Sequence, residues 1–364
     1  MKKKVLLLSL FQANGGIASW SKKFIKTFDS DKYCLVPVDR STGLSVTDGR
    51  IMWKRIVYGL IALHNVMKSV KKVITNNDIA ILHTTTSGGL MGTIRDNLIA
   101  KICYKSDIKR VMHCRYGCIT EDLHNGIYGK FLRKTMARYN QIWVLDNRSA
   151  NTIMEYPELR DKVFITPNSI AVSENMTIAP KSYKHIAFIA NLVPSKGLFE
   201  LIEAFKRVDD KGLTLSIVGE GSTNVLEKLK ETTSGYDNIR IVGLLPNDEA
   251  VRFMQAIDIV ALPTYMPQEA FPISILEAMS LGKLVISTRH AAIGDILTGL
   301  DGNPCGYFVR EQSVEDIVKA IKWCTENSDA ADELCRKAYD KVYNCYRMEV
   351  VYNLYISLYD KLLK

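Results

Sequence analysis

The sequence has 364 residues, of which 47% are hydrophobic and 24% are charged. This composition is typical of a soluble globular enzyme and excludes a disordered or fibrous protein. A chain of this length predicts two domains, whose cores need no disulfide or metal for stability. The eight cysteines are scattered, and we expect them to be the reduced thiols of a cytoplasmic protein.

The net charge of +9 is concentrated in the first half of the chain. Residues 1–176 carry +13, whereas residues 177–364 carry −4. A strongly basic half favours an anionic partner, such as a phosphorylated acceptor or an acidic lipid surface. No base-reading motif accompanies the charge, so nucleic acid is not expected as a partner.

The first half alternates short apolar runs with helical stretches. Its first run, VLLLSL (5–10), follows three lysines as in a signal peptide, but it is short and Gly15-Gly16 comes soon after, so we expect a buried strand. No membrane-spanning helix is predicted, because charged and polar residues interrupt the nearest candidate, 51–67. Further strands are expected at 79–84, 110–114, 141–146 and 163–167, with amphipathic helices at 19–28 and 50–70.

The same rhythm restarts after a polar stretch at 172–184, where we expect the domain boundary. The second set of predicted strands is 185–190, 213–219, 239–245, 258–263 and 284–288. Two runs of β–α units predict an α/β protein with two doubly wound, Rossmann-like parallel sheets, in domains 1–176 and 177–346 that face a central cleft. Ligands of such sheets bind beyond the carboxyl ends of the strands, so the residues after each strand are candidates for a site.

The first such segment is QANGGIASW, after the first strand. Gly15 and Gly16 let the backbone approach a ligand, and the helix that follows supplies free N–H groups. The spacing of the GxGxxG dinucleotide fingerprint is absent. A tight turn between strand and helix explains the glycine pair as well, so the segment alone predicts no ligand.

The most informative segment is PTYMPQEAFPISILEAMSLGKLVIST (263–288). It is typical of a strand end, a loop, a helix with proline at its start and glycine at its end, and another strand. Glu269 precedes this helix and Glu277 lies in its second turn. Carboxylates placed there can accept hydrogen bonds from sugar hydroxyls, while N–H groups of residues 271–274 can hold a phosphate.

EAFPISILEAMSLGKLVIS resembles the E-x7-E region of the retaining glycosyltransferases of family 4, the glycogen-synthase-like and mannosyltransferase-like glycosyl transferases of group 1, which have the GT-B fold. Other segments resemble the same family in order: the glycine loop, TPNS (166–169), IANLVPSKG (189–197), IVGEGS (217–222) and NPCGYFV (303–309). Residues 347–364 resemble the family's last helix, which crosses back to the N-terminal domain. The resemblance covers nearly the whole chain.

The resemblance implies roles for individual residues. Glu277 would accept hydrogen bonds from the nucleotide ribose, Glu269 would hold hydroxyls of the transferred sugar, and Lys196 would neutralise the departing diphosphate. His113, at the end of its strand, matches the family histidine near acceptor and sugar. Glu269, His113 and Lys196 are therefore the expected catalytic residues. The other expected donor-binding residues are Gly15, Gly16, Asn191, Gly219, Gly243, Leu244, Ala270, Phe271, Pro272, Ile273 and Ser274.

Two positions depart from the family pattern. Asn191 stands where the diphosphate loop usually carries an arginine, so one positive charge is missing. Either Arg115, Arg289 or the glycine loop compensates for this missing charge, or the departing diphosphate is stabilised less. Ala171 stands where the family has an aspartate. Neither departure changes the two glutamates, so an enzyme is still the leading interpretation.

No metal or other cofactor is expected beside the nucleotide-diphosphate sugar, which is a co-substrate. Asp29-Ser30-Asp31 has the spelling of a metal-binding Asp-x-Asp motif, but it follows a predicted helix instead of ending a strand. Lys196 and helix dipoles would supply the electrostatic stabilisation that a metal gives elsewhere.

The basic segment RIMWKRIVYGLIALHNVMKSVKK (50–72) mixes aromatic and aliphatic residues with lysines and arginines. It fits a helix packed on the first sheet, and it also fits a helix on an anionic membrane surface. Two weaker interactions of the whole basic N-terminal domain stay open: loose docking on acidic headgroups at the inner face of the cell membrane, and attraction of a lipid diphosphate. Arg115 and Tyr116, just after His113, are candidates for the acceptor side.

Together these features predict a retaining, metal-independent hexosyltransferase with UDP among its candidate nucleotides. The donor would bind the C-terminal domain, and a saccharide or lipid-linked saccharide acceptor the N-terminal one, in the assembly of a surface polysaccharide such as capsule or lipopolysaccharide. A Rossmann oxidoreductase is an alternative with the same architecture, but its fingerprint is missing. A non-catalytic nucleotide-sugar-binding relative or partner subunit is a second alternative, which Asn191 favours.

Overall fold

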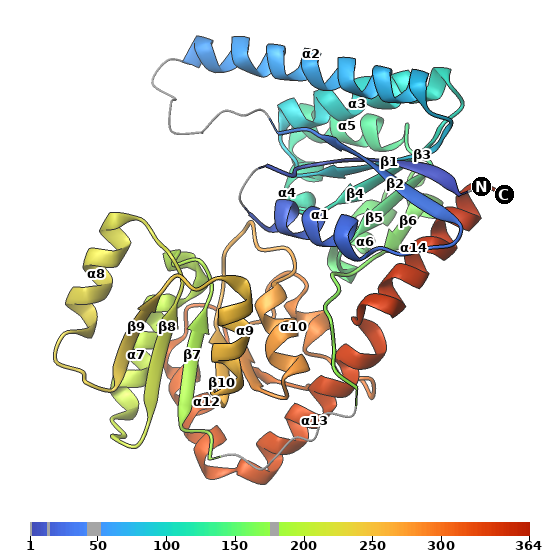
Figure 1. Ribbon diagram of the computed structural model, residues 1–364. Helices are drawn as coiled ribbons and strands as arrows, with labels where there is room; N and C mark the ends of the chain where they lie inside the picture. Colours follow the sequence, from blue (N-terminus) through green and yellow to red (C-terminus); the bar gives the residue numbers. More distant parts are fainter. Residues whose placement is uncertain (1, 13–14, 42–51, 175–181) are drawn as a thin grey trace. The chain divides into compact units, whose positions relative to one another are not determined.

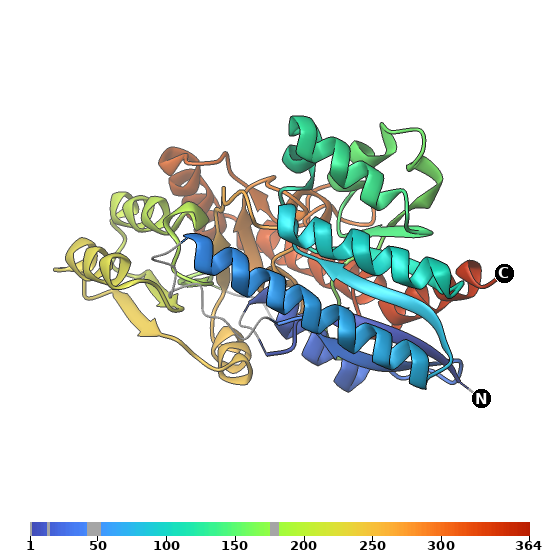
Figure 2. The ribbon, with the colours of Figure 1, turned by 90° about the horizontal axis from the view of Figure 1, so that it is seen from above.

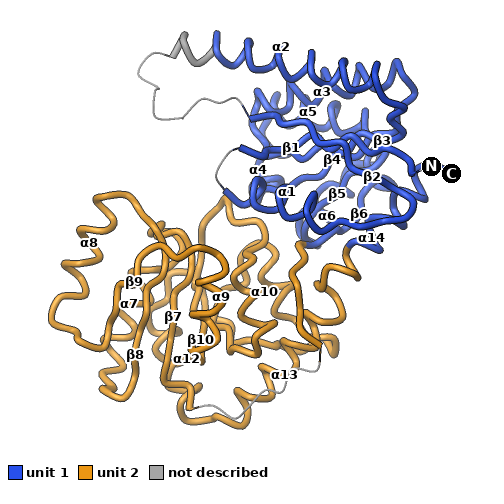
Figure 3. The backbone as a smooth tube through the Cα atoms, in the orientation of Figure 1, with its two compact units in different colours: residues 1–167, 352–364 blue, residues 168–351 orange. Residues whose placement is uncertain are grey.

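The computed structural model describes residues 2–12, 15–41, 52–174 and 182–364, with side chains for all of these except 52–56. The chain divides into two compact units, which Figure 3 shows in different colours: residues 1–167 with 352–364 (unit 1), and residues 168–351 (unit 2). The boundary expected within 172–184 falls partly outside the described residues. Each unit contains one six-stranded sheet, and every strand pair in it is parallel.

The sheet of unit 1 has the strand order β2-β1-β3-β4-β5-β6. Its strands are β1 (Lys3–Ser9), β2 (Tyr33–Asp39), β3 (Ile79–Thr86), β4 (Lys109–Cys114), β5 (Gln141–Val144) and β6 (Val163–Ile165). Its helices are α1 (Gly16–Thr27), α2 (Met52–Asn76), α3 (Leu90–Lys105), α4 (Ile119–His124), α5 (Gly126–Met136) and α6 (Asn147–Met154).

Helices cover both faces of this sheet (Figure 1). Successive side chains of a strand point to opposite faces, so each strand contributes to two layers. Leu6, Met112 and Ile142 pack under α2, α3 and α5 in one hydrophobic core. His83 and Trp143 lie on the other face, where their rings contact aromatic side chains of α1 and of the chain's last helix. The second face is thus aromatic where the first is aliphatic.

β2 is a strand that the apolar pattern does not predict, because Pro37 interrupts it. Proline has no N–H to donate, so it is tolerated only where one side of a strand needs no partner. β2 meets this condition because it is the edge strand of the sheet, and Pro37 is in register with Leu7 of β1. α2 extends beyond the predicted 50–70, to Asn76; residues 50 and 51 lie outside the described part of the chain.

The sheet of unit 2 has the order β12-β11-β10-β7-β8-β9. Its strands are β7 (His185–Ile189), β8 (Thr214–Val218), β9 (Ile239–Gly243), β10 (Ile259–Leu262), β11 (Leu284–Ser287) and β12 (Tyr307–Phe308). Its helices are α7 (Leu198–Val208), α8 (Thr223–Thr233), α9 (Asn247–Gln255), α10 (Ile273–Ser280), α11 (Ile293–Ile296), α12 (Val314–Glu326) and α13 (Ser328–Cys345), followed by the start of α14 (Met348–Leu362). The prediction of two doubly wound parallel sheets is confirmed.

The last residues of the chain return to unit 1, as predicted for the final helix. Residues 352–364 belong to that unit. Tyr355 and Tyr359 of α14 are completely buried there. Gln141 of β5 donates from Nε2 to the carbonyl oxygen of Leu358 at 3.0 Å, and the Tyr33 hydroxyl donates to Asp360 at 2.7 Å. These contacts make the C-terminal helix part of the N-terminal sheet domain.

In unit 2 the strand order reverses between β7 and β10. Chains that leave such adjacent strands run in opposite directions, which opens a crevice beyond their carboxyl ends. The two loops at this point are residues 190–197 and 263–272. They carry Lys196 and Glu269, so the topology brings these two predicted site residues to one edge of the sheet.

Candidate functional site

α10 is an apolar helix that carries a single carboxylate. Ile275, Leu276 and Met279 are completely buried, whereas Glu277 is only half-buried. Pro272 stands directly before the first helical residue, with φ −70°, and makes no side-chain cap. The first turn of α10 therefore keeps N–H groups available at the carboxyl edge of the sheet, which is the condition for anion binding at a helix start.

The loops after β7 and β10 touch because glycine lies at their contact. Gly197 has φ +79°, and a Cβ on it would lie 2.3 Å from the carbonyl oxygen of Pro263. The backbone N–H of Tyr265 donates to the carbonyl oxygen of Ser195 at 2.8 Å. Only a residue without a side chain permits this approach. The contact fixes the position of Lys196, which lies between Ser195 and Gly197.

Lys196 and Glu269 form an ion pair at this point. The distance from Lys196 Nζ to Glu269 Oε2 is 2.9 Å, and the side chains are 15% and 12% exposed. Removing two charges this far from water costs free energy that the pair only partly returns. Lys196 can therefore exchange Glu269 for an anionic group of a ligand. Glu269 can in turn exchange Lys196 for a ligand group that carries positive charge.

Glycines also let the loops after β7, β8 and β9 stack closely. Gly219, directly after β8, has φ +151°, and a Cβ on it would lie 1.9 Å from the carbonyl oxygen of Ala190. Its N–H donates to the carbonyl oxygen of Gly243 at 2.9 Å. Asn191 and Leu244 lie on the exposed side of these loops. The predicted donor residues of three strands thus gather at one edge.

We expect Gly219→Ala to destabilise the protein far more than Gly243→Ala. Both glycines have positive φ, but Gly243 has no atom within 4 Å of a built Cβ. Gly243→Ala should cost about 1–2 kcal/mol for backbone conformation alone, and Gly219→Ala at least about 3 kcal/mol more because of the clash. Urea denaturation measures both losses. Equal losses would show that the loops are not packed as described.

Contacts from other parts of unit 2 hold the loop before α10, and His290 among them lies outside the motifs found in the sequence. Asn168 donates from Nδ2 to the carbonyl oxygen of Phe271 at 3.1 Å, and the Phe271 ring packs edge-on against Tyr346, 5.7 Å away. His290 lies with Nε2 2.8 Å from the carbonyl oxygen of Met266. Phe271 is thus a buried anchor, and Asn168 and His290 hold the segment that carries Glu269.

In unit 1, Gly15 and Gly16 are exposed at the start of α1. Gly15 has φ +117°, and a Cβ on either glycine would meet no atom of the described residues within 4 Å. The carbonyl oxygen of Gly15 accepts the first helical hydrogen bond, from the N–H of Ser19. The preceding Asn14 lies outside the described residues. The geometry leaves the backbone of this turn open to solvent.

His113 is completely buried at the end of β4. Arg115 Nη1 donates to His113 Nε2 at 3.1 Å, and because an arginine only donates, that ring nitrogen carries no proton. The proton is therefore on Nδ1, which donates to His83 Nε2 at 3.1 Å. His83 Nδ1 in turn lies 2.5 Å from the Tyr359 hydroxyl. Burial is the main cause that lowers the pKa of His113 well below 6.5 and that of His83 to about 3, with the Arg115 charge as a further cause.

Arg115 and Tyr116, the two acceptor-side candidates, differ in their surroundings. The Arg115 guanidinium is buried and stacks on the Trp20 ring at 3.9 Å. Burial lowers its pKa to about 10. Tyr116 is half-buried beside Asp122, and Gly88 closes over both: a Cβ there would lie 2.6 Å from the Tyr116 ring. The structure therefore brings His113 and Arg115 together, and places Tyr116 in a separate cluster.

Within the described part of the chain, no three histidine, cysteine, aspartate or glutamate side chains gather as metal ligands. Among the same residues, no helix combines the length and apolar character needed to cross a bilayer.

Comparison with known proteins identifies relatives of unit 2 and of the whole fold. Residues 173–341 match the family of glycosyl transferases group 1. The gpi3 subunit of phosphatidylinositol N-acetylglucosaminyltransferase from Schizosaccharomyces pombe is 26% identical over 226 residues, which are 60% of this chain and 45% of the relative. The capsular polysaccharide biosynthesis glycosyltransferase CapM of Staphylococcus aureus is 22% identical over 238 residues, 65% of this chain and 59% of CapM. The chain spans about half the length of the curated relatives it matches.

Among solved structures, HepE of Anabaena in complex with UDP superposes with a TM-score of 0.73 at 13% identity, covering 98% of this chain and 100% of HepE. At this identity the likeness shows the fold, which is the predicted GT-B fold.

Proposed function

We propose that the protein is a retaining glycosyltransferase, because residues 173–341 match the family of glycosyl transferases group 1. It moves a hexose-type sugar from a UDP-sugar to a saccharide or lipid-linked saccharide acceptor. The observation that carries the proposal is the half-buried Lys196–Glu269 ion pair at the point where the strand order of unit 2 reverses. The UDP held by the similar HepE structure supports this nucleotide.

The diphosphate of the donor binds at the loop edge of unit 2. Lys196 supplies a cation, and the N–H groups at the start of α10 supply hydrogen-bond donors for the phosphate oxygens. Glu277, one turn further into α10, accepts hydrogen bonds from the ribose hydroxyls. No metal ion is required in this proposal, since the cation and the helix terminus already face the developing negative charge.

Donor binding exchanges the partners of the ion pair. The diphosphate takes the Lys196 ammonium, which stands 2.9 Å from Glu269 in the free protein. The Glu269 carboxylate is then available to accept hydrogen bonds from sugar hydroxyls and to stabilise positive charge on the sugar ring. The ion pair thus keeps both groups oriented before the substrate arrives, which lowers the cost of organising the site.

In the transfer step the bond between the anomeric carbon and the diphosphate oxygen breaks, and the acceptor hydroxyl oxygen bonds to that carbon. The acceptor proton passes to the departing diphosphate, whose oxygen lies on the face that the acceptor approaches. The configuration at the anomeric carbon is therefore retained without a covalent enzyme intermediate. Lys196 stabilises the leaving diphosphate, which is where charge develops most.

Unit 1 supplies the acceptor side in this proposal. His113 is completely buried, so it acts as a positioning residue that holds the Arg115 guanidinium at 3.1 Å. The Arg115 charge then attracts the anionic groups of the substrates. The role of CapM in capsular polysaccharide biosynthesis favours a surface polysaccharide as the product.

We expect UDP to raise the unfolding temperature of the protein, and Glu277→Ala to remove that shift. At about 100 times its dissociation constant a ligand adds roughly 2.7 kcal/mol to the free energy of unfolding. The measurement is a thermal unfolding series with millimolar UDP, GDP, ADP, dTDP and NAD⁺. Glu227→Ala on α8, where the glutamate is exposed, is the matched control and should keep the full shift.

Each outcome bears on one part of the proposal. A shift with another nucleoside diphosphate that depends on Glu277 would keep the glycosyltransferase and replace UDP. A shift with NAD⁺ alone would contradict the glycosyltransferase and favour an oxidoreductase. UDP binding without any release of UDP from UDP-sugars would favour a non-catalytic binding protein.

A further inference from the structure

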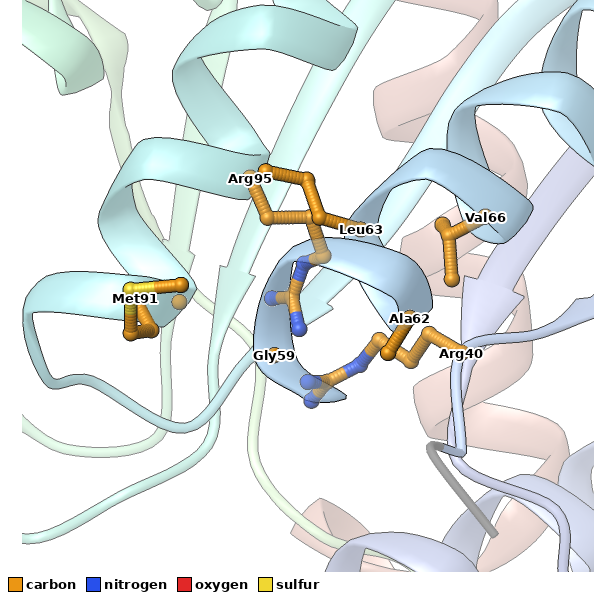
Figure 4. Close-up of a pocket in the computed structure, with 8 residues that line it drawn as sticks. Arg40, Gly59, Ala62, Leu63, Val66, Met91 and Arg95 are labelled. Atoms are coloured by element: carbon orange, nitrogen blue, oxygen red, sulfur yellow. The ribbon is translucent and has the colours of Figure 1, made fainter. Parts of the chain in front are cut away.

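A pocket lies in unit 1, at the carboxyl edge of its sheet and between α2 and α3. Its volume is about 450 Å³ including the part open to solvent, and its walls come from the end of β2 and from these two helices (Figure 4). Figure 2 shows α2 and α3 side by side above the sheet. Arg40 directly follows β2 and donates from Nη2 to the Thr85 hydroxyl near the end of β3, at 3.4 Å. The carboxyl edge of a parallel sheet is where ligands of such folds bind.

Arg40 is a buried cation without a counter-ion in the described part of the chain. The residue is only 5% exposed and forms no ion pair with any described residue. Its Nε is buried and has no hydrogen-bond partner among these residues. A guanidinium has five N–H donors, and leaving one buried and unpaired costs free energy. Burial lowers the pKa of Arg40 to about 9, so the group still carries its charge at neutral pH.

A second arginine turns toward the same space. Figure 4 shows the guanidinium groups of Arg40 and Arg95 converging beside Gly59 of α2. The Arg95 charge is one of the causes that lower the pKa of Arg40, as expected for two cations at close range. Two carboxylates also act on Arg40, those of Asp96 and Asp39. Neither carboxylate forms an ion pair with Arg40: Asp96 Oδ1 pairs with Arg95 at 2.7 Å, and Asp39 Oδ1 accepts a hydrogen bond from the Ser41 hydroxyl at 2.6 Å.

The rest of the pocket is apolar, and apolar surface continues outward from it. Leu63, Val66 and Met91 form its walls, while Gly59 leaves its centre open. On the outer side of α2, and at the start of α3, large apolar side chains are between 39% and 57% exposed: Val57, Tyr58, Leu60, Ile61, Leu90 and Met91. A helix that is apolar on both sides normally lies wholly inside a protein or in contact with lipid.

We propose that this pocket binds a phosphate group carried on a long apolar chain, with the phosphate on Arg40 and Arg95 and the chain along the exposed apolar side of α2. The phosphate supplies the counter-ion that Arg40 lacks, and bidentate contacts between arginine and phosphate are among the strongest charge-assisted hydrogen bonds. The apolar chain covers surface that is otherwise exposed to water.

The assignment of this ligand as the acceptor rests on the proposed function. A sugar acceptor attached to a lipid through phosphate would be held in unit 1 by that phosphate, whatever saccharide it carries. Binding of the lipid phosphate does not depend on sugar transfer by the protein. An experiment can therefore contradict one of the two proposals and leave the other standing.

The test measures binding of farnesyl phosphate to the full chain by titration calorimetry, without detergent and below the concentration at which the lipid aggregates. Inorganic phosphate and farnesol are titrated separately, to distinguish a lipid-borne phosphate from free phosphate and from a bare chain. We expect farnesyl phosphate to bind at least tenfold more tightly than either. Tight binding of inorganic phosphate alone would overturn the lipid part of the proposal.

Two variants and one control locate the site. Arg40→Gln removes the unpaired charge and should weaken farnesyl phosphate binding at least tenfold. Gly59→Leu should do the same by filling the pocket, and a built Cβ there meets only the flexible end of Met91, at 3.5 Å. Arg148→Gln removes an exposed arginine of unit 1 and should leave binding unchanged. Both site variants should keep the UDP-induced thermal shift of wild type, which shows that they are folded.

The remaining outcomes are decisive as well. Binding that survives both variants would place the lipid elsewhere and overturn the proposal. Light scattering that shows a dimer broken by Ile61→Ser, together with no farnesyl phosphate binding, would assign the apolar face to self-association instead. Lipid phosphate binding that depends on Arg40, in a protein that binds no nucleotide, would keep this site and remove only its role as acceptor site.

Discussion

Replacing Lys196 by alanine is expected to slow release of UDP from the UDP-sugar by a factor of roughly 10² to 10³, the usual loss when one preorganised stabiliser of a developing anion is removed. Lys196 is the cation that meets the leaving diphosphate in the proposed reaction, and its side chain is only 15% exposed. Water therefore replaces it poorly. The measurement is steady-state turnover under saturating donor.

Lys211→Ala is the matched control, because this lysine of unit 2 is 82% exposed and only approaches Asp209 at 3.6 Å. It should turn over like wild type. Lys196→Ala leaves Glu269 without its ion-pair partner and should lower the urea midpoint. Turnover is therefore compared without urea, where circular dichroism should show that the variant is folded, so that lost turnover reflects chemistry. Turnover of Lys196→Ala within twofold of wild type would remove Lys196 from the catalytic site.

Acidification from pH 7.5 to pH 5 is expected to destabilise the protein by as much as about 4 kcal/mol through His83 and His113. Both side chains are completely buried, and burial lowers the pKa of His83 to about 3 and that of His113 well below 6.5. The unfolded chain therefore takes up protons first as the pH falls through 6.5. The free energy of unfolding then decreases with decreasing pH until the folded histidines also titrate, near pH 3 for His83.

Urea denaturation at several pH values measures this slope. His113→Asn removes one of the two titrating groups while keeping an amide to pair with His83, so it should reduce the slope by about one proton. If the pH dependence of the free energy of unfolding is unchanged in His113→Asn, His83 and His113 do not form a neutral, buried pair.

The loop and helix that carry Glu269 and Glu277 could be predicted because their signals are local. Proline before an apolar run and glycine after it mark the two ends of α10 within one short stretch of sequence. The ion pair between Lys196 and Glu269 could not be predicted from those signals. It depends on β7 and β10 being neighbours, and on Gly197 approaching Pro263, which only the folded sheet brings about.

The environment of His113 illustrates the same limit. Its place at a strand end follows from the apolar run before it. Its contact with His83 depends on the register that sets His113 opposite Thr85 and Trp143. Its complete burial depends on α14, which arrives from the other end of the chain and places Tyr355 and Tyr359 on the same face of the sheet.

Arg40 carries no local signal at all. Its strand is obscured by Pro37, and in sequence it is one of many basic residues in the first half of the chain. What distinguishes it is the absence of an oppositely charged partner among the described residues, which is a property of packing. A missing counter-ion is visible only in three dimensions, where Asp96 pairs with Arg95 instead.

Hydrogen–deuterium exchange with and without UDP measures whether unit 2 holds a nucleoside diphosphate at the loops after β7, β8 and β10. UDP should slow amide exchange in residues 191–197, 217–222 and 269–274, and Glu277→Ala should lose this protection. Saturating UDP that protects none of these segments, or protects only segments of unit 1, would contradict a nucleotide site at these loops.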